Sequence, residues 1–232
     1  MATSYNLKLI TDGLVYYLDA ANPRCYAGTG LTSYGLVGNI VGSLAGSVGF
    51  GTSNNGSFIF NDTSDHISLG NPTVLQGLQL NMTLSCWFNQ RSNVSYGTLY
   101  SDYSAVGGHK LVSLLRVDSG QLRYYTSDSA GNYQYVQPAS ITNGSWYFVS
   151  VTISGILGAP VATIFLNGTT YSYNLVPLSS TPFTGSTHCI GGNVHNNEYF
   201  DGNIALTQIY NRALSAAEVR QNYNATKGRY GL

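Results

Sequence analysis

The carboxylates of this chain are too few and too scattered to cleave a glycosidic bond. That chemistry needs two carboxylates about 5 Å apart for retention of configuration, or about 6.5–9.5 Å apart for inversion. The chain has only two glutamates, Glu198 and Glu218. Glu218 fits a helix-capping sequence, and Glu198 lies alone in a turn at residues 193–199. No two acidic residues alternate along one strand pattern, so we predict that the protein is not an enzyme.

A nucleophile activated by histidine is equally poorly supported. His188 and Cys189 are neighbours in one strand pattern, so their side chains point to opposite faces. Zinc-binding sequences of the H-E-x-x-H and H-x-E types are absent. The sequence therefore favours binding over covalent catalysis.

Three aspartates are candidate ligands for a metal ion. Calcium takes six to eight hard oxygen ligands, and Asp62, Asp65 and Asp201 lie near strand ends where they can converge. The amides of Asn61 and Asn203 would complete a weak site. The competing interpretation is that both acidic segments are ordinary turns, which use aspartate for structural reasons.

Tyrosine is the most abundant aromatic residue, with 19 copies in the chain. Aromatic rings stack on apolar ligand faces, while hydroxyls and amides orient the ligand. Tyr124 and Tyr125 point in opposite directions, so one of them belongs to the core. The ligand-binding candidates are Tyr96, Tyr100, Tyr103, Tyr133, Tyr135 and Tyr199. Cross-strand packing or a contact between subunits is the alternative role for these rings.

Positive charge gathers near the C-terminus at Arg220, Lys227 and Arg229. A solvated face is the usual meaning of such a cluster. The same residues are our candidates for docking on an acidic partner surface.

Overall charge argues against two classes of partner. Lysine plus arginine and aspartate plus glutamate number 10 each, and only 9% of the residues are charged. Nucleic acid and anionic membranes attract basic surfaces, so neither is an expected partner. No apolar stretch is long enough to insert into a membrane, and we expect no signal peptide. A neutral surface favours association, so we predict a subunit of a homo- or hetero-oligomeric assembly.

Hydrophobic alternation with a period of two predicts an all-β protein of about fourteen strands. The clearest strand spans residues 82–88, and Asn167-Gly168 predicts a tight hairpin between two neighbouring strands. Residues 28–51 are rich in glycine and serine, which predicts weak strands or a meandering loop. One short helix is predicted at residues 215–223, where Ser215 and Glu218 form a capping box and Asn224 is a reasonable stop.

These elements predict a single domain covering residues 1–232. A short N-terminal arm occupies residues 1–12, and the helix with a basic tail occupies residues 214–232. The expected architecture is a two-sheet antiparallel jelly-roll sandwich with one short C-terminal helix.

Several blocks, in order along residues 14–224, resemble the laminin G-like branch of the concanavalin A-like lectin family. They are FNDTSDHISL at 60–69, LSCWF at 84–88, WYFVSVTI at 146–153, IFLNG at 164–168, FDGNIALTQIYNRAL at 200–214 and SAAEVRQNY at 215–223. The resemblance implies two curved antiparallel sheets, with Trp87 and Trp146 in core packing. It also implies carbohydrate or protein binding, with calcium at the rim in many members.

The last residues resemble the endings of laminin G-like virion structural proteins of tailed bacteriophages. The similar segment, NYNATKGRYGL, spans residues 222–232. The resemblance implies a virion surface protein made in the host cytoplasm: a capsid decoration, head fibre or tail appendage. Its partners would be other virion proteins and surface glycans. The alternative is a free calcium-dependent carbohydrate-binding lectin, and a glycoside hydrolase is the third and least favoured class.

Overall fold

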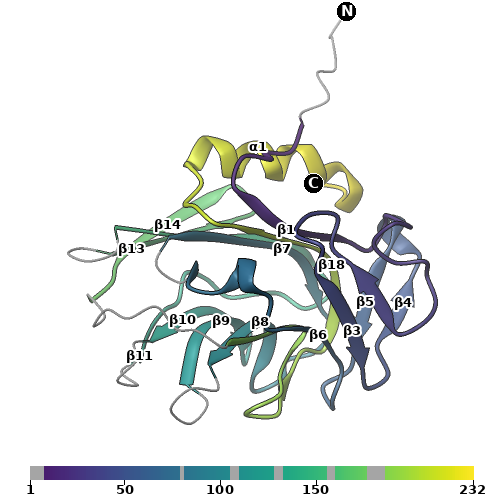
Figure 1. The fold of residues 1–232 in the computed structure, drawn as a ribbon. Coiled ribbons are helices and arrows are strands. Elements are labelled where there is room, and N and C mark those ends of the chain that lie inside the picture. The colour runs from purple at the N-terminus through teal and green to yellow at the C-terminus, as the bar shows by residue number, and fades with distance from the viewer. Residues whose placement is uncertain (1–7, 79–80, 105–109, 128–132, 156–159, 177–185) are drawn as a thin grey trace, which may run out of the picture.

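The computed structural model describes residues 8–78, 81–104, 110–127, 133–155, 160–176 and 186–232. Two large antiparallel sheets face each other, and one helix, α1 (Ala216–Thr226), covers the outer side of one sheet (Figure 1). The predicted all-β sandwich with one short C-terminal helix is therefore confirmed. The N-terminal arm was predicted at residues 1–12, of which 1–7 lie outside the described residues.

The sheet beneath α1 is called sheet A. Its strands run in the order β14-β13-β12-β7-β18-β5-β4, and β1 also pairs with β18. The bounds are β14 (Thr169–Asn174), β13 (Val161–Leu166), β12 (Trp146–Ser154), β7 (Met82–Gln90), β18 (Gly202–Tyr210), β5 (Ser57–Phe60), β4 (Gly49–Gly51) and β1 (Leu14–Asp19).

The opposite sheet is called sheet B, with the order β11-β10-β9-β8-β15-β6-β3-β2. The bounds are β11 (Tyr133–Val136), β10 (Gln121–Ser127), β9 (Lys110–Asp118), β8 (Gly97–Ser104), β15 (Ser186–Ile190), β6 (His66–Gly70), β3 (Val41–Ala45) and β2 (Thr32–Tyr34). A small hairpin of β16 (Gly192–Asn193) and β17 (Glu198–Tyr199) contacts β8. Short 3₁₀ helices occupy Ser53–Asn55 (η1), Thr73–Leu75 (η2) and Lys227–Tyr230 (η4).

Alternation along β7 divides its side chains between two cores, as the sequence predicts. Met82, Leu84, Cys86 and Phe88 belong to the main core between the sheets. Trp87 points outward into a second cluster beneath α1. Sheet A is therefore buried on both faces where the helix crosses it.

The capping box at the start of α1 is confirmed. The Glu218 backbone N–H donates to Ser215 Oγ, and the Ser215 N–H donates back to Glu218 Oε2. Hydrogen bonds from Arg212, followed by those from Ser215, lower the pKa of Glu218 to about 2. The helix does not stop at Asn224 as predicted but continues to Thr226, whose hydroxyl accepts a hydrogen bond from Trp87 Nε1.

The C-terminal residues are not a loose tail. They form η4, whose Tyr230 is buried and stacks on Trp87 with ring centroids 4.0 Å apart. Arg229 Nη1 forms an ion pair of 2.8 Å with Asp19 Oδ1 in β1. The C-terminal residues therefore contact two strands of sheet A, packing on β7 through Tyr230 and pairing with β1 through Arg229.

The segment rich in glycine and serine forms strands β2, β3 and β4. Within this segment, β3 begins at Val41. Gly38 adopts φ 83° between β2 and β3, and a Cβ there would lie 2.3 Å from the Val15 carbonyl oxygen. The turn therefore requires glycine.

A buried acid–base pair lies on the inner side of sheet B. Asp102 in β8 and His188 in β15 are register partners, and Asp102 Oδ1 is 3.8 Å from His188 Nδ1. The Tyr100 hydroxyl lies 2.8 Å from the same ring nitrogen. Burial raises the pKa of Asp102 to about 8 and lowers the pKa of His188 to about 4.

This pair predicts a specific dependence of stability on pH. Between pH 6.5 and 8 the folded pair binds one proton and the unfolded pair binds none, whichever partner carries it. Stability should therefore fall as pH rises through that window, by about 1.4 kcal/mol per pH unit. Between pH 4 and 6.5 both states bind one proton, so the two contributions cancel.

Urea unfolding at pH 6.5 and pH 8 checks this expectation. The Asp102→Asn variant should lose the fall in stability between these two values. An equally steep fall in that variant would show that other groups cause it.

Candidate binding face

The outer face of sheet B carries two rows of side chains that the strand register brings together. Arg116 in β9 lies opposite Arg123 in β10. Tyr125 in β10 lies opposite Tyr135 in β11. Their strand neighbours Leu115, Val117, Leu122 and Tyr124 point into the main core. The alternation therefore forces both arginines and both tyrosines outward.

Arg116 is held at the centre of this face. Its guanidinium pairs with Asp118 through Nε and with Glu198 through Nη1, at 2.5 and 2.9 Å. The group also lies over the rings of Tyr96 and Tyr125, at 4.7 and 4.5 Å from the centroids. Such stacking on a desolvated guanidinium fixes both the cation and the rings.

Arg123 supports the next tyrosine along the face. Its guanidinium is 5.2 Å from the Tyr135 ring centroid, and its Nη1 donates to Asp118 Oδ2 at 2.9 Å. Its Nε donates to Gln137 Oε1 at 2.7 Å. The rings of Tyr125 and Tyr135 lie 5.1 Å apart. We call the set Tyr96, Arg116, Arg123, Tyr125, Tyr133 and Tyr135 the tyrosine–arginine face.

The charges beneath this face cancel. Arg116 and Arg123 are matched by Asp118 and Glu198. Burial acts to lower the pKa of Arg116, but Glu198, Tyr125 and Asp118 outweigh burial, and the pKa is raised. The face therefore presents aromatic rings over a fixed and nearly neutral charge network, which suits a neutral ligand.

Three of the six predicted tyrosines lie exposed on this face. Tyr96, Tyr133 and Tyr135 expose 52%, 67% and 52% of their surface. Tyr103 is buried at the β8 end, where Asn196 Nδ2 donates to its hydroxyl at 3.1 Å. Tyr199 is buried beside His66.

The prediction for Tyr100 is wrong, because this side chain belongs to the main core. A β-bulge between Thr98 and Tyr100 turns two successive residues, Leu99 and Tyr100, toward the interior. The bulge breaks the regular alternation of side chains along β8.

Arg116, Arg123, Asp118 and Glu198 were not among the predicted site residues. The sequence does contain a pattern that could have identified the two arginines. Each is a single basic residue within an otherwise largely apolar strand, and alternation along that strand predicts which face its side chain occupies. No local pattern pairs Arg116 with Glu198, which is 82 positions away.

The prediction of three aspartates around one metal ion is wrong, because Asp65 does not join the other two. Asp62 and Asp201 are near each other, since burial and then the charge of Asp201 raise the pKa of Asp62. Asp65 accepts hydrogen bonds from the backbone N–H groups of Ser47 and Asn61. Asp201 is engaged by Arg91 and Ser92. Over the described ranges, no three histidine, cysteine, aspartate or glutamate side chains group as metal ligands.

The basic residues proposed for docking differ in their surroundings. Arg229 is committed to Asp19 and to the carbonyl oxygens of Asn54 and Gly56. Lys227 Nζ lies 5.3 Å from the Tyr223 ring centroid. Arg220 is exposed on α1. Docking through Arg220, Lys227 and Arg229 stays a prediction.

The carboxylates on the tyrosine–arginine face are occupied by protein donors. Glu198 receives Arg116 on Oε1 and the Asn193 side-chain amide on Oε2, at 2.9 and 2.8 Å. Asp118 Oδ1 faces Arg116, and Oδ2 receives Arg123 and the Tyr125 hydroxyl. A glycosidase presents one carboxyl to the leaving oxygen. Here the carboxylates of Asp118 and Glu198 both pair with arginine, an arrangement that favours a binding role over hydrolysis.

Comparison with solved structures supports the fold. Trypanosoma rangeli sialidase in complex with sialic acid has 14% identity and a TM-score of 0.68, covering 95% of this chain and 34% of that one. The binding domain of Paraclostridial Mosquitocidal Protein 1 has 15% identity and a TM-score of 0.69, covering 92% and 52%. The receptor binding domain of botulinum neurotoxin C/D mosaic serotype has 18% identity and a TM-score of 0.68, covering 93% and 51%.

The chain thus spans about a third of the sialidase and about half of each toxin structure. At these identities the likeness concerns the lectin-like β-sandwich alone. Within the described residues, no helix is long and apolar enough to cross a membrane.

Sequence comparison assigns the family. No curated protein matches the chain. The profile described as the concanavalin A-like lectin/glucanases superfamily, Laminin_G_3, matches residues 61–220. That match covers more than half of the chain and includes most of both sheets. The chain therefore belongs to the concanavalin A-like lectin/glucanases superfamily.

Proposed function

We propose that this protein is a non-enzymatic adhesion module that binds neutral carbohydrate on the tyrosine–arginine face. One observation carries the proposal: the exposed rings of Tyr96 and Tyr135 each lie against an arginine that is fixed by carboxylates. A binding site gains affinity when its contacts are already ordered before the ligand arrives. These rings are ordered by the sheet and by the ion pairs beneath them.

The chemistry of the face favours sugars among neutral ligands. Pyranose rings present an apolar C–H face that packs on tyrosine, and hydroxyls that pair with phenol and amide groups. Tyr133 and Tyr135 share the face on β11, and Asn196 lies beside Tyr103 at the β8 end. The surface therefore offers several neighbouring contacts to an oligosaccharide.

Glycan binding should depend on Tyr135. Replacing it with alanine removes an exposed ring from the face, and we expect the dissociation constant to rise about tenfold, or about 1.4 kcal/mol. Binding is measured by glycan array, followed by calorimetry with the strongest neutral glycan. Tyr34→Ala is the matched control, because Tyr34 in β2 has the same exposed fraction, 52%, outside this face.

Equal losses in the two variants would contradict the assignment of the face. Failure of the unmodified protein to bind any glycan would contradict the adhesive function itself. Binding abolished by chelation would favour the calcium-dependent lectin instead.

We further propose that this module acts at the surface of a tailed-bacteriophage virion. The support is the resemblance of residues 222–232, which in the structure form the end of α1 and η4. A neutral chain also favours association.

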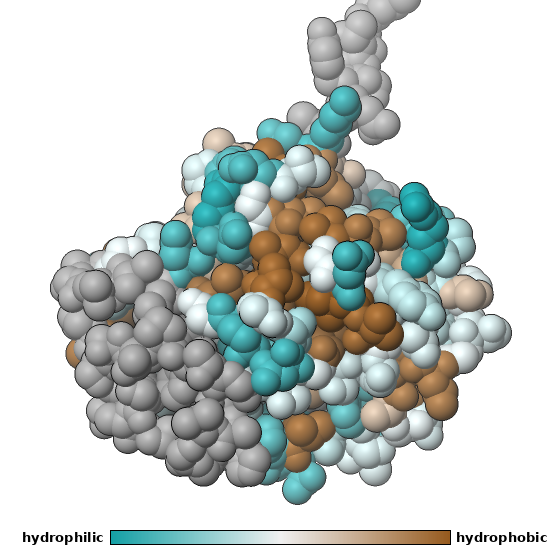
Figure 2. Space-filling view, in the orientation of Figure 1, coloured by the Kyte–Doolittle hydropathy of each residue, from teal (hydrophilic) through white to brown (hydrophobic). Residues whose placement is uncertain are grey.

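Figure 2 shows hydrophobic side chains gathered on one face of the molecule, which is consistent with a subunit in an assembly. Exposed apolar side chains include Leu31, Leu36 and Val41, in or beside β2 and β3. Imaging of particles labelled with an antibody against this protein tests the location. Labelling of intact particles is expected, and its absence would overturn the virion role.

A further inference from the structure

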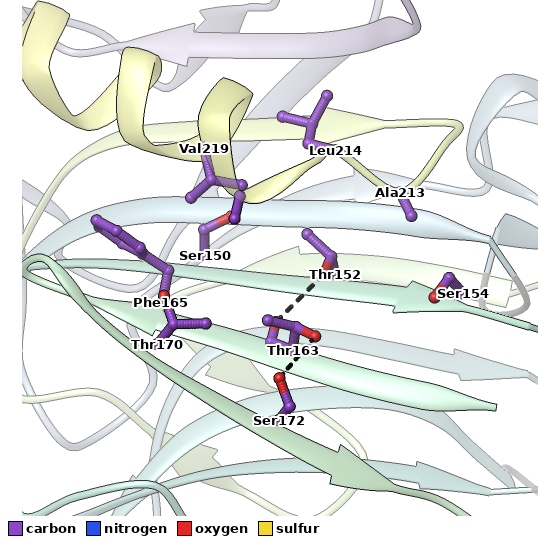
Figure 3. A pocket seen from close by; sticks show the side chains of 11 residues that line it. Ser150, Thr152, Ser154, Thr163, Phe165, Thr170, Ser172, Ala213, Leu214 and Val219 are labelled. Atoms are coloured by element: carbon purple, nitrogen blue, oxygen red, sulfur yellow. Dashed lines mark hydrogen bonds between the residues drawn. The ribbon is translucent and has the colours of Figure 1, made fainter.

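A pocket of about 300 Å³ lies on the other side of the sandwich from the tyrosine–arginine face. It opens between the outer face of sheet A and the segment that leads into α1 (Figure 3). Strands β12, β13 and β14 form its floor, and Ala213, Leu214, Ala216 and Val219 form the opposite wall. Its volume lies at the lower end of the range for small-molecule sites.

The floor of the pocket is an ordered set of hydroxyl groups. Thr152, Thr163 and Ser172 are register partners on three adjacent strands, so they form one row across the sheet (Figure 3). Neighbouring strands are about 4.8 Å apart. The other hydroxyls of the lining belong to Ser150, Ser154 and Thr170.

These hydroxyls offer both donors and acceptors. Thr152 Oγ1 donates to the Thr163 carbonyl oxygen, so the lone pairs of Thr152 Oγ1 can accept a hydrogen bond from a ligand. Thr163 and Ser172 share one hydrogen bond of 3.3 Å, so one of the two keeps its proton. The buried Ser150 hydroxyl accepts from Ser85 and retains its own proton.

The opposite wall of the pocket is apolar, and among the described residues no ionisable side chain lines the pocket. Phe165 adds an aromatic ring beside Val219 (Figure 3). A charged ligand would be desolvated there without a partner, which is unfavourable. A wholly apolar ligand would bury the hydroxyls unpaired. The matching ligand is uncharged, with hydroxyls along one side and C–H groups on the other.

We propose that this pocket is a second carbohydrate site, which binds the ring of a neutral monosaccharide or of a terminal sugar residue. Its residues belong to sheet A, to the segment before α1 and to α1 itself, so the pocket shares no residue with the tyrosine–arginine face. Two sites on opposite sides of one sandwich let the module hold two glycan chains at once. Such bivalence raises the effective affinity for a glycan-coated surface without any new contact.

Nuclear magnetic resonance of the ¹⁵N-labelled full chain tests this second site. The probes are methyl α-D-mannopyranoside, methyl β-D-galactopyranoside and methyl α-L-fucopyranoside. At least one probe should give saturable shifts of the Thr163, Ser172 and Ala216 amides, with a dissociation constant in the millimolar range. If none of the three probes shifts these amides, the proposal is overturned.

A matched pair of variants tests the role of the hydroxyl row. Thr163→Val keeps the shape but removes one hydroxyl, so the pocket should bind about three- to tenfold more weakly. Thr32→Val makes the same change on the exposed strand β2 and should leave the shifts unaltered. Unchanged binding by Thr163→Val would overturn the assignment of this row.

The two proposals fail in distinguishable ways. Shifts restricted to Arg123 and Tyr135 would overturn the pocket but support the tyrosine–arginine face. Shifts restricted to the residues of the pocket would support the pocket and overturn the tyrosine–arginine face as a carbohydrate site. In the Tyr135→Ala variant, the pocket should respond to the probe as it does in the unmodified protein.

Discussion

Replacing Trp87 with alanine is expected to lower the free energy of unfolding by about 3–5 kcal/mol, the usual cost of truncating a fully buried large aromatic side chain. Trp87 lies at the centre of the cluster between sheet A and the C-terminal helices. Its ring stacks on Tyr230 and Tyr223, with centroids 4.0 and 5.8 Å away. Its Nε1 donates to Thr226 Oγ1 at 2.8 Å.

The loss of stability in Trp87→Ala should have two causes. The substitution leaves a cavity in the second cluster, and it removes the packing that holds the C-terminal segment on sheet A. Tyr230 sits on η4, so removing Trp87 takes away the surface on which the chain end packs. Urea unfolding followed by circular dichroism measures the change. Trp87→Phe, which keeps an aromatic ring but loses the indole hydrogen bond, should cost clearly less. A loss below about 1 kcal/mol in Trp87→Ala would show that the C-terminal segment is not integral to the fold.

Replacing Arg116 with alanine should destabilise the protein by a similar amount, about 3–5 kcal/mol. The change takes the cation Arg116 away from Glu198 and leaves Asp118 paired with Arg123, and both carboxylates are largely buried. A buried charge without its partner is costly because it is neither solvated nor neutralised. The rings of Tyr96 and Tyr125 lose the cation that holds them. Carbohydrate binding by the folded fraction should therefore fall as well.

An exposed ion pair provides the matched control. Asp12 pairs with Arg212 Nε at 2.9 Å, but 86% of the Asp12 side chain is exposed to solvent, and Arg212 also pairs with Glu218. Asp12→Ala should cost no more than about 1 kcal/mol, as is usual for surface ion pairs. Unfolding experiments on both variants at one pH and salt concentration measure the contrast. Equal costs would contradict a special role for the Arg116 network.

Local patterns predicted most of the fold. The period of two divided β7 correctly between two cores. Asn167 and Gly168 form the expected tight turn, with φ values of 44° and 105°. The capping box placed the start of α1 at the correct residue. Each of these features depends on neighbours within a few positions, so the sequence carries it directly.

The sequence-based predictions that were wrong concern features that depend on contacts between residues far apart in the sequence. A bulge in β8 turns Tyr100, a predicted ligand-binding residue, into the main core, and bulges leave little trace in a hydrophobic pattern. Asp65 and Asp201 were expected to meet at a metal, but each is used by donors from elsewhere in the fold. The end of α1 depends on packing against Trp87, more than 130 positions earlier.

Only part of the tyrosine–arginine face could be predicted from the sequence. Tyr96, Tyr133 and Tyr135 could be selected by residue type and alternation. The network beneath them joins β9, β10 and the β16–β17 hairpin through Arg116 and Glu198. Only the assembled sheet shows that two apparently isolated acids in turns meet at one arginine.

A crystal structure of the protein with its strongest neutral oligosaccharide tests the central claim most directly. We predict an intact sugar lying on the rings of Tyr96 or Tyr135, with Arg116 still paired to Asp118 and Glu198. A cleaved sugar held between those two carboxylates, or an oligosaccharide bound away from this face, would contradict the account.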